Sequence, residues 1–113
     1  FYMVSFLANK MNIPFIPIRK SGKLPGDTIS QSYDLEYGKS EIEIHRSDIK
    51  ENWNVLIHDD LLATGGTASA AAELLLKLNA NIVGFGFIVN LHFLDGKNKL
   101  EKYSDKIITL IDY

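Results

Sequence analysis

Apolar residues follow two different spacings along the chain. The run Val55–Ile57 is short, contains two β-branched residues and follows a polar cluster, which is typical of a strand buried on both faces. Over residues 71–78, apolar side chains recur at intervals of three and four, and this period predicts a helix over residues 67–78. On that helix, Glu73 and Lys77 are spaced for a favourable i, i+4 ion pair.

The same reasoning predicts further short strands on both sides of this helix. They are expected at Ile13–Ile18, Ile42–His45, Ile82–Val89 and Lys106–Ile111. Strands that alternate with a helix favour parallel βαβ packing. The sequence therefore predicts an α/β fold in which a mostly parallel twisted sheet is flanked by helices, within a single domain over residues 1–113.

One long connection interrupts this alternation. Residues 20–39 are rich in Gly, Ser, Asp and Pro, and we expect them to be irregular. A connection of this length inside a small domain is usually a functional lid or a disordered stretch.

The start of the chain differs from that of a complete protein. Its first residue is Phe1, and residues 1–12 have a helical pattern in which Met3, Leu7 and Met11 share one face. We therefore expect an upstream segment in the natural protein, and we interpret this chain as a domain truncated at its amino terminus.

Composition excludes several classes of protein. The formal net charge is −2, which argues against broad, charge-driven binding of nucleic acid. The chain has no cysteine, so disulfides, thiol catalysis and cysteine-ligated metals are excluded. Its apolar segments are too short and too interrupted to span a bilayer, and no basic leader precedes the first one. We expect a cytoplasmic protein with no membrane partner.

Two aspartates stand at the end of the strand expected at residues 55–58. Ligands of parallel sheets gather at the carboxyl ends of the strands, where Asp59 and Asp60 are expected. Successive strand residues point to opposite faces, so the two carboxylates should differ in role. One can accept hydrogen bonds from a ribose diol, and the other can orient a loop or a hydrated metal. We interpret the neighbouring His58 as a strand residue, because His45 and His92 lack metal-ligand spacing to it.

A glycine turn joins this strand to the helix. Gly65 and Gly66 allow positive φ and direct several N–H groups toward one point. The helix amino terminus, with Thr64 and Thr67 beside it, adds its dipole and unpaired N–H groups, which favours a phosphate ligand. No lysine occurs between Lys50 and Lys77, and this disfavours a P-loop nucleotide site.

Each part of this pattern alone is usually an ordinary turn or a solvated strand end, but the order of the parts is specific. The segment resembles the phosphoribosyl diphosphate (PRPP) binding motif of the type I phosphoribosyltransferases, which have a Rossmann-like fold. The resemblance implies that Asp59 and Asp60 hold the ribose hydroxyls. It also implies that the 5′-phosphate is cradled by Ala63, Thr64, Gly65, Gly66 and Thr67.

Three cations lie at the start of the long connection. Arg19, Lys20 and Lys23 lie within five residues, and a solvated basic turn would be the ordinary interpretation. A sugar-phosphate site whose leaving group is pyrophosphate, however, needs positive charge over the developing anion.

Two further blocks narrow the resemblance to the adenine phosphoribosyltransferase family. They are Gly-Lys-Leu-Pro-Gly at residues 22–26 and Leu-Glu-Tyr-Gly-Lys at residues 35–39. The resemblance implies that residues 22–39 form a long flexible catalytic loop. Within it, Glu36 would take part in proton traffic at the purine, and Tyr37 would close over the sugar and pyrophosphate.

The resemblance also implies a reaction. The phosphoribosyl group of PRPP would pass to adenine, giving AMP and pyrophosphate in purine salvage, with Mg²⁺ held mainly by PRPP oxygens and water. Arg19, Lys20 and Lys23 would meet the pyrophosphate within a homodimer, and Leu91 would contact the purine. Asn90 stands where the family usually has glutamate, and Lys97 where arginine is usual after Gly96.

Two other functions fit the same residues. A PRPP-binding regulatory protein can keep this fold without catalysis, although it need not retain the loop that carries Glu36 and Tyr37. A phosphoribosyltransferase for another base would share the phosphate turn.

Overall fold

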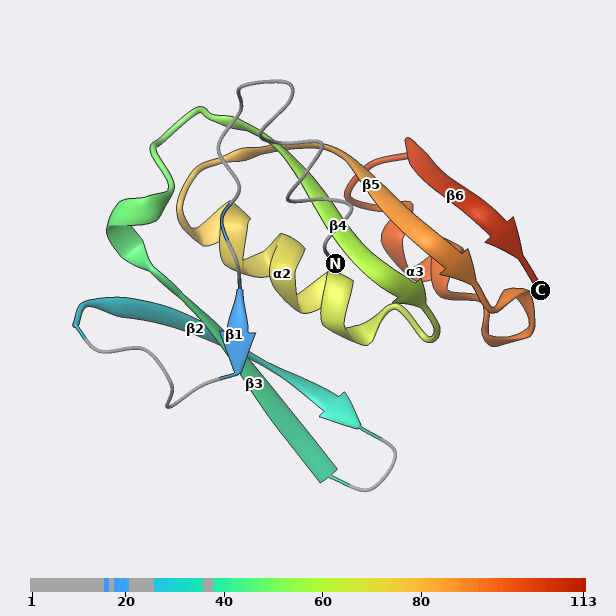
Figure 1. Ribbon diagram of the computed structural model, residues 1–113. Coiled ribbons are helices and arrows are strands. Elements are labelled where there is room, and N and C mark those ends of the chain that lie inside the picture. The colour runs from blue at the N-terminus through green and yellow to red at the C-terminus, as the bar shows by residue number, and fades with distance from the viewer. Residues whose placement is uncertain (1–15, 17, 21–25, 36–37) are drawn as a thin grey trace.

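The computed structural model describes residues 16, 18–20, 26–35 and 38–113. The expected helix at residues 1–12 and most of the strand expected at Ile13–Ile18 lie outside these residues. The strands are β1 (Arg19–Lys20), β2 (Thr28–Leu35), β3 (Gly38–His45), β4 (Asn54–Leu62), β5 (Asn81–Asn90) and β6 (Ile107–Asp112). The helices are α2 (Gly66–Lys77) and α3 (Gly96–Leu100), with single 3-10 turns η1 (Arg46–Asp48) and η2 (His92–Leu94) (Figure 1).

A parallel sheet with the order β4-β5-β6 forms one half of the molecule. Ile57 lies opposite Phe85, which in turn lies opposite Ile107. Helix α2 connects β4 to β5, as expected for a βαβ unit. The predicted parallel α/β packing is confirmed, and each strand boundary within it differs from the prediction by only a few residues.

An antiparallel sheet with the order β1-β3-β2 forms the other half. Strands β2 and β3 pair over their whole lengths, from Thr28 opposite His45 to Leu35 opposite Gly38. The expectation that residues 20–39 are irregular, within a flexible loop at 22–39, is therefore wrong for Thr28–Leu35. The polar side chains of β2 concealed its strand character, because the pairing with β3 is made by backbone groups.

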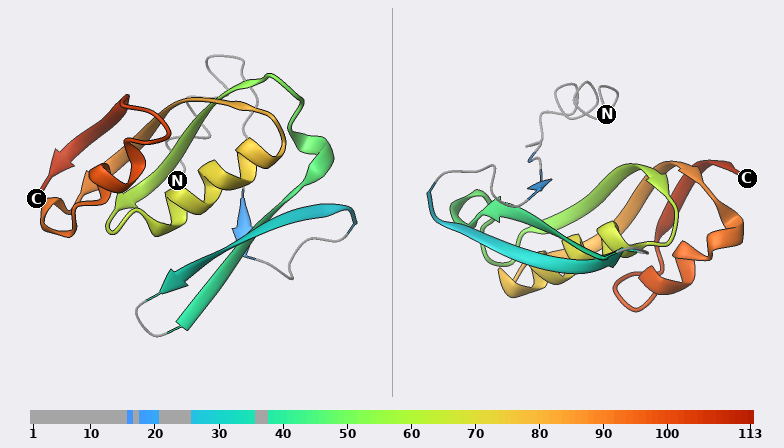
Figure 2. Two further views of the ribbon diagram at one scale, coloured as in Figure 1. Left: turned by 180° about the vertical axis from the view of Figure 1, so that it is seen from behind. Right: turned by 90° about the horizontal axis from the view of Figure 1, so that it is seen from below.

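Helix α2 packs against both sheets, and the core lies between these elements (Figures 1 and 2). The fully buried side chains come from β3, β4, α2, β5 and α3, and the largest of them are Phe85, Ile44, Leu62, Leu74, Leu75, Leu100 and Asn90. Burial of each large apolar side chain contributes about 1.5–3 kcal/mol relative to an exposed one. The apolar residues whose spacing predicts α2 thus form the face of the helix that packs against both sheets.

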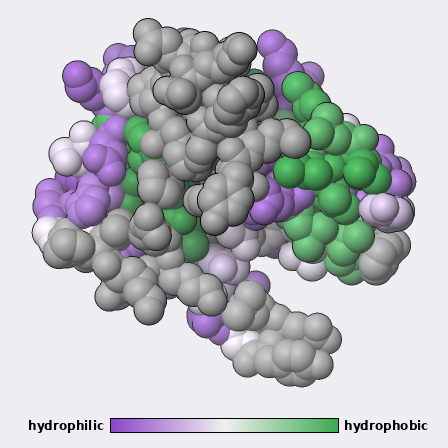
Figure 3. Space-filling model, in the orientation of Figure 1, coloured by the Kyte–Doolittle hydropathy of each residue, from purple (hydrophilic) through white to green (hydrophobic). Residues whose placement is uncertain are grey.

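The second face of the parallel sheet is open in the described part of the chain. Helices α2 and α3 lie on the same face (Figure 2, right). Leu56 of β4 is 58% exposed, and Ile108 of β6 is 63% exposed. Apolar side chains gather on the surface where β6 lies (Figure 3). The expectation that β4 is buried on both faces is therefore wrong for Leu56, because no described element covers that side.

The expected pair of Glu73 and Lys77 is replaced by longer-range contacts. Glu73 accepts a hydrogen bond from the Tyr103 hydroxyl at 2.5 Å. Lys77 donates to the Ser30 carbonyl oxygen of β2 at 3.4 Å. Each side chain thus has a tertiary partner in place of the i, i+4 pair that the helix spacing predicts.

Candidate functional site

The two aspartates lie inside β4 and not after it. The strand continues to Leu62, and a turn of three residues then leads to α2. Gly65 has a φ of 87°, a left-handed conformation that residues with a Cβ rarely adopt. This turn reverses the chain sharply, so the first residues of α2 lie beside the end of β4.

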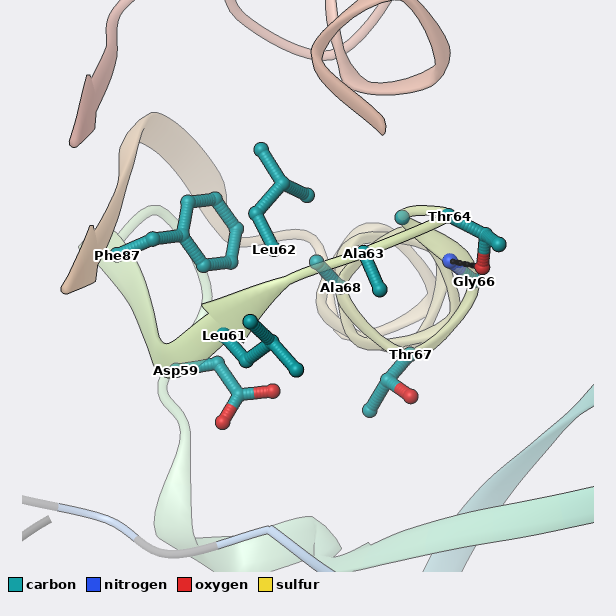
Figure 4. Close-up of a pocket in the computed structure, with 10 residues that line it drawn as sticks. Asp59, Leu61, Leu62, Ala63, Thr64, Gly66, Thr67, Ala68 and Phe87 are labelled. Carbon is teal, nitrogen blue, oxygen red and sulfur yellow. Dashed lines mark hydrogen bonds between the residues drawn. The ribbon is translucent and has the colours of Figure 1, made fainter. Parts of the chain in front are cut away.

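A hollow opens at this end of the parallel sheet (Figure 4). Asp59 lines it together with Phe87 of β5. The remaining lining residues form one continuous segment through the turn: Leu61, Leu62, Ala63, Thr64, Gly65, Gly66, Thr67 and Ala68. The structure therefore brings all five residues of the expected phosphate cradle together with one of the two aspartates.

Backbone N–H groups at the start of α2 provide the hydrogen-bond donors of the hollow. The first N–H groups of a helix have no intrahelical acceptor. Gly66 N–H donates to Thr64 Oγ1 at 3.4 Å, a long contact, and the first helical bond of this end joins Ser69 N–H to the Gly65 carbonyl at 2.8 Å. The N–H groups of Thr67 and Ala68 precede that bond. Together with the helix dipole, they suit an anionic ligand.

Asp60 is placed differently from Asp59. Its backbone N–H donates to Asp59 Oδ1 at 2.8 Å, which fixes the neighbouring carboxylate. Its own Oδ1 lies 3.7 Å from His58 Nε2, two residues earlier on the strand. Asp60 does not line the hollow, so the two carboxylates occupy different environments, while their difference in role stays a prediction. His58 is a strand residue, as interpreted from the sequence.

Helix α3 supports the glycine turn from behind. A Cβ on Gly65 would stand 3.0 Å from the Gly96 carbonyl oxygen, and one on Gly96 would overlap the Ala63 carbonyl oxygen. Gly96 was noted in the sequence only for its position before Lys97, and its contact with the turn was missed. No local pattern signals such an approach, because the two segments are about thirty residues apart in sequence.

The end of β2 also reaches this region. A Cβ built on Gly66 would lie 3.7 Å from Tyr33 Cδ2 and 3.8 Å from the Asp34 carbonyl oxygen. The hairpin formed by β2 and β3 is thus adjacent to the glycine turn. Glu36 and Tyr37 themselves lie outside the described residues.

The basic residues are described only in part. Arg19 and Lys20 form β1, where they lie opposite Glu43 and Ile42 of β3. Their side chains, and all of Lys23, lie outside what the structure describes.

Asn90 is the buried polar residue at the end of β5. It is 1% exposed, and its side-chain amide donates to Asp112 Oδ1 at 3.0 Å. Thr109 Oγ1 donates to the same oxygen at 2.9 Å. These hydrogen bonds, that from Asn90 foremost, hold the pKa of the Asp112 carboxyl below its usual value. Leu91 follows directly, and its N–H donates to the Leu62 carbonyl at 2.9 Å, although Leu91 does not line the hollow.

Two absences apply to the described residues. Their His, Asp and Glu side chains form no group of three or more that could hold a metal ion. No helix among them is both long and apolar enough to cross a membrane.

Known proteins share this sequence and this structure. Residues 1–112 match the phosphoribosyl transferase domain family. Adenine phosphoribosyltransferase of Christiangramia forsetii is 49% identical over 113 residues, which are all of this chain and 65% of the relative. That of Halothermothrix orenii is 54% identical over 105 residues, covering 93% of this chain and 61% of the relative. The chain thus spans about three fifths of the length of these relatives.

Solved structures agree in fold. Adenine phosphoribosyltransferase of Thermoanaerobacter pseudethanolicus has a TM-score of 0.91 at 45% identity and matches 96% of this chain and 62% of its own. The Saccharomyces cerevisiae enzyme, solved with an imino-altritol bisphosphate and adenine, has a TM-score of 0.87 at 42% identity and matches 93% and 58% of the two chains. The resemblance to adenine phosphoribosyltransferases and the predicted fold class are therefore confirmed, and the chain belongs to the phosphoribosyl transferase domain family.

Proposed function

We propose that the protein containing this chain transfers the 5-phosphoribosyl group of PRPP to adenine and releases AMP and pyrophosphate, a step of purine salvage. The observation that carries the proposal is the convergence of Asp59 and residues 63–67 on one hollow at the carboxyl end of a parallel sheet. The relatives named adenine phosphoribosyltransferase support the choice of base.

The glycine turn would hold the 5′-phosphate. Ala63, Thr64, Gly65, Gly66 and Thr67 would surround it, with backbone N–H groups at the start of α2 as donors. The site holds its donors in place before the ligand arrives, so little reorganisation is needed on binding. Anchoring the phosphate fixes one end of the sugar and limits its rotation.

The aspartates would set the position of the ribose. Asp59 and Asp60 would accept hydrogen bonds from the ribose hydroxyls, with Asp59 nearer the phosphate. Because Asp60 lies outside the hollow and close to His58, its contact requires the ribose to extend beyond the hollow. Two fixed points on the sugar would hold C1′ in line between the leaving group and the base.

Charge at the leaving group would come from outside the hollow. Arg19, Lys20 and Lys23 would neutralise pyrophosphate, Tyr37 would cover the sugar, and Glu36 would handle a proton at the purine. The end of β2 lies beside Gly66, and Glu36 and Tyr37 follow β2 directly in the sequence, which supports the roles proposed for these two residues. Exclusion of water by the hairpin would limit hydrolysis of PRPP.

Mg²⁺ fits this site as an ion that arrives on the substrate. Magnesium usually keeps several waters and binds through substrate phosphates with few carboxylates. The exposed Asp59 and Asp60 carboxylates can accept hydrogen bonds from such waters. When bound, the ion supplies positive charge that stabilises the departing pyrophosphate.

Leu91 would contact the purine from the end of β5, where its N–H donates to the Leu62 carbonyl oxygen.

We further propose that residues 1–113 belong to a single catalytic domain of a cytoplasmic homodimer. The net charge of −2 argues against charge-driven binding of nucleic acid, and we propose no membrane partner for this domain.

Pyrophosphate release by the full-length protein tests the proposal. PRPP and Mg²⁺ would be supplied with adenine, hypoxanthine, guanine or uracil in parallel reactions. Release with adenine alone is expected. Release with another base would overturn the specificity and keep the site, whereas binding of PRPP without release for any base would favour a regulatory protein.

A further inference from the structure

A line of three polar side chains fastens the first turns of α2 to the segment between α3 and β6. Tyr103 donates its hydroxyl proton to Glu73 Oε2 at 2.5 Å. The Tyr103 oxygen also lies 3.1 Å from Ser69 Oγ. Since the tyrosine proton is directed to the carboxylate, the serine hydroxyl is the donor of this second bond.

The position of Ser69 gives this network its importance. Ser69 is buried, and its N–H makes the first helical hydrogen bond, to the Gly65 carbonyl at 2.8 Å. The backbone N–H of Ser69 therefore bonds to the glycine turn, and its side-chain hydroxyl bonds to Tyr103. A shift of the Tyr103 hydroxyl would therefore reach the glycine turn through Ser69, just before the N–H groups of Thr67 and Ala68.

The Tyr103 ring is itself held in place by the core. It meets Phe85 edge to face, with ring centroids 6.5 Å apart. Phe85 stacks on Phe87 at 6.4 Å, and Phe87 lines the hollow. The Tyr103 side chain thus lies between β5 and α2, and the packing of its ring against Phe85 sets the position of its hydroxyl.

We propose that Tyr103 is a positioning residue for the phosphate site: through Ser69 and Glu73 it fixes the amino-terminal turn of α2 in the orientation that binds the 5′-phosphate of PRPP. The inference rests on the proposed function for its ligand. It assigns no contact between Tyr103 and substrate.

Substitution of the hydroxyl alone separates positioning from packing. Tyr103→Phe keeps the ring and removes both hydrogen bonds, and Ser69→Ala removes one of them. In the full-length protein, each variant is expected to raise the KM for PRPP about threefold to tenfold, the factor that corresponds to one net hydrogen bond, with kcat changed less than about twofold. The double variant should be no worse than Tyr103→Phe, because both changes break the same contact.

Glu73 offers a test by conservative replacement. Glu73→Gln retains an oxygen that accepts from Tyr103, so its KM for PRPP should stay close to that of the wild type. Glu73→Leu removes the acceptor and should resemble Tyr103→Phe. Tyr113→Phe is the matched control, since this exposed tyrosine lies outside the network.

Amide hydrogen exchange provides a readout that is independent of activity. Ser69 N–H should exchange about tenfold faster in Tyr103→Phe than in the wild type, and core amides of β5 should not change. A lower melting temperature with unchanged KM and unchanged Ser69 exchange would overturn the proposal, because Tyr103 would then only pack. If the wild type turned over no base, the proposed function would fail, and the exchange result would still decide whether Tyr103 fixes the turn.

Discussion

The backbones of Gly96 and Ala63 are in close contact. A Cβ on Gly96 would overlap the Ala63 carbonyl oxygen and lie 2.7 Å from Leu62 Cδ1. Helix α3 can therefore approach the glycine turn only because residue 96 has no side chain. The contact joins the end of β4 to a segment that follows β5, and it gives the glycine turn a fixed support.

Gly96→Ala should disturb both the fold and the site. The added methyl must push the Ala63 carbonyl away, and overpacking of this kind costs about 1–3 kcal/mol in the free energy of unfolding. We expect a weaker affinity for PRPP as well, because Ala63 lines the hollow. Urea denaturation and a PRPP titration measure the two effects.

Gly86→Ala is the control for that substitution. A Cβ there would lie 3.9 Å from the nearest atom, His58 Nδ1, in ordinary contact. Its free energy of unfolding should change by less than about 0.5 kcal/mol. Equal losses in the Gly86 and Gly96 variants would show that the close approach of α3 is unimportant.

Gly65→Ala tests the left-handed conformation of the turn. The residue has a φ of 87°, where an alanine costs about 1–2 kcal/mol, and its Cβ would also meet Gly96 at 3.0 Å. We expect a lower melting temperature and loss of PRPP binding. Gly66→Ala is the comparison, since its Cβ would make only ordinary contacts, the nearest at 3.6 Å, and alanine favours a helix, so the melting temperature should not fall. A Gly65 variant as stable as the Gly66 variant would contradict this account.

Asp60→Asn should lower turnover and PRPP affinity without unfolding the domain. A hydrogen bond to a charged group contributes about 1.5–3 kcal/mol, which corresponds to a loss of about 10-fold to 150-fold in kcat/KM. Asp59→Asn is expected to lose at least as much, because Asp59 lines the hollow and accepts the Asp60 N–H. Asp105→Asn, in the exposed segment before β6, is the control. Unchanged kinetics for Asp60→Asn would refute its assignment to the ribose hydroxyls.

The Asp112 carboxyl should make stability depend on acid pH. Hydrogen bonds from Asn90 and Thr109 lower its pKa in the folded state from an ordinary value of 3.8. The ionised group therefore contributes stability above pH 3.8, and this contribution is lost as the pH falls through the lower, folded pKa. The gap in urea midpoint between wild type and Asp112→Asn should be largest above about pH 5 and should close in stronger acid. A gap that widened on acidification would contradict the assignment.

Local sequence determined the elements that carry the chemistry. The apolar run of β4, the helical period of α2 and the glycines between them lie within 24 residues, so backbone propensity and periodicity were sufficient to predict them. The proposed phosphate cradle at residues 63–67 is continuous in the chain, and its predicted chemistry follows from glycine backbones and a helix amino terminus. For the same reason the sequence alone predicts which residues line the hollow through the turn.

Tertiary structure decided what is distant in sequence. The polar strand β2 was misjudged as irregular because its partner is the backbone of β3, and Glu73 was paired with Lys77 although Tyr103 takes its carboxylate. The support that Gly96 gives to the turn has no local signal at all. Sequence periodicity reports which face of an element is apolar, whereas the identity of the segment that packs there depends on how the whole chain folds.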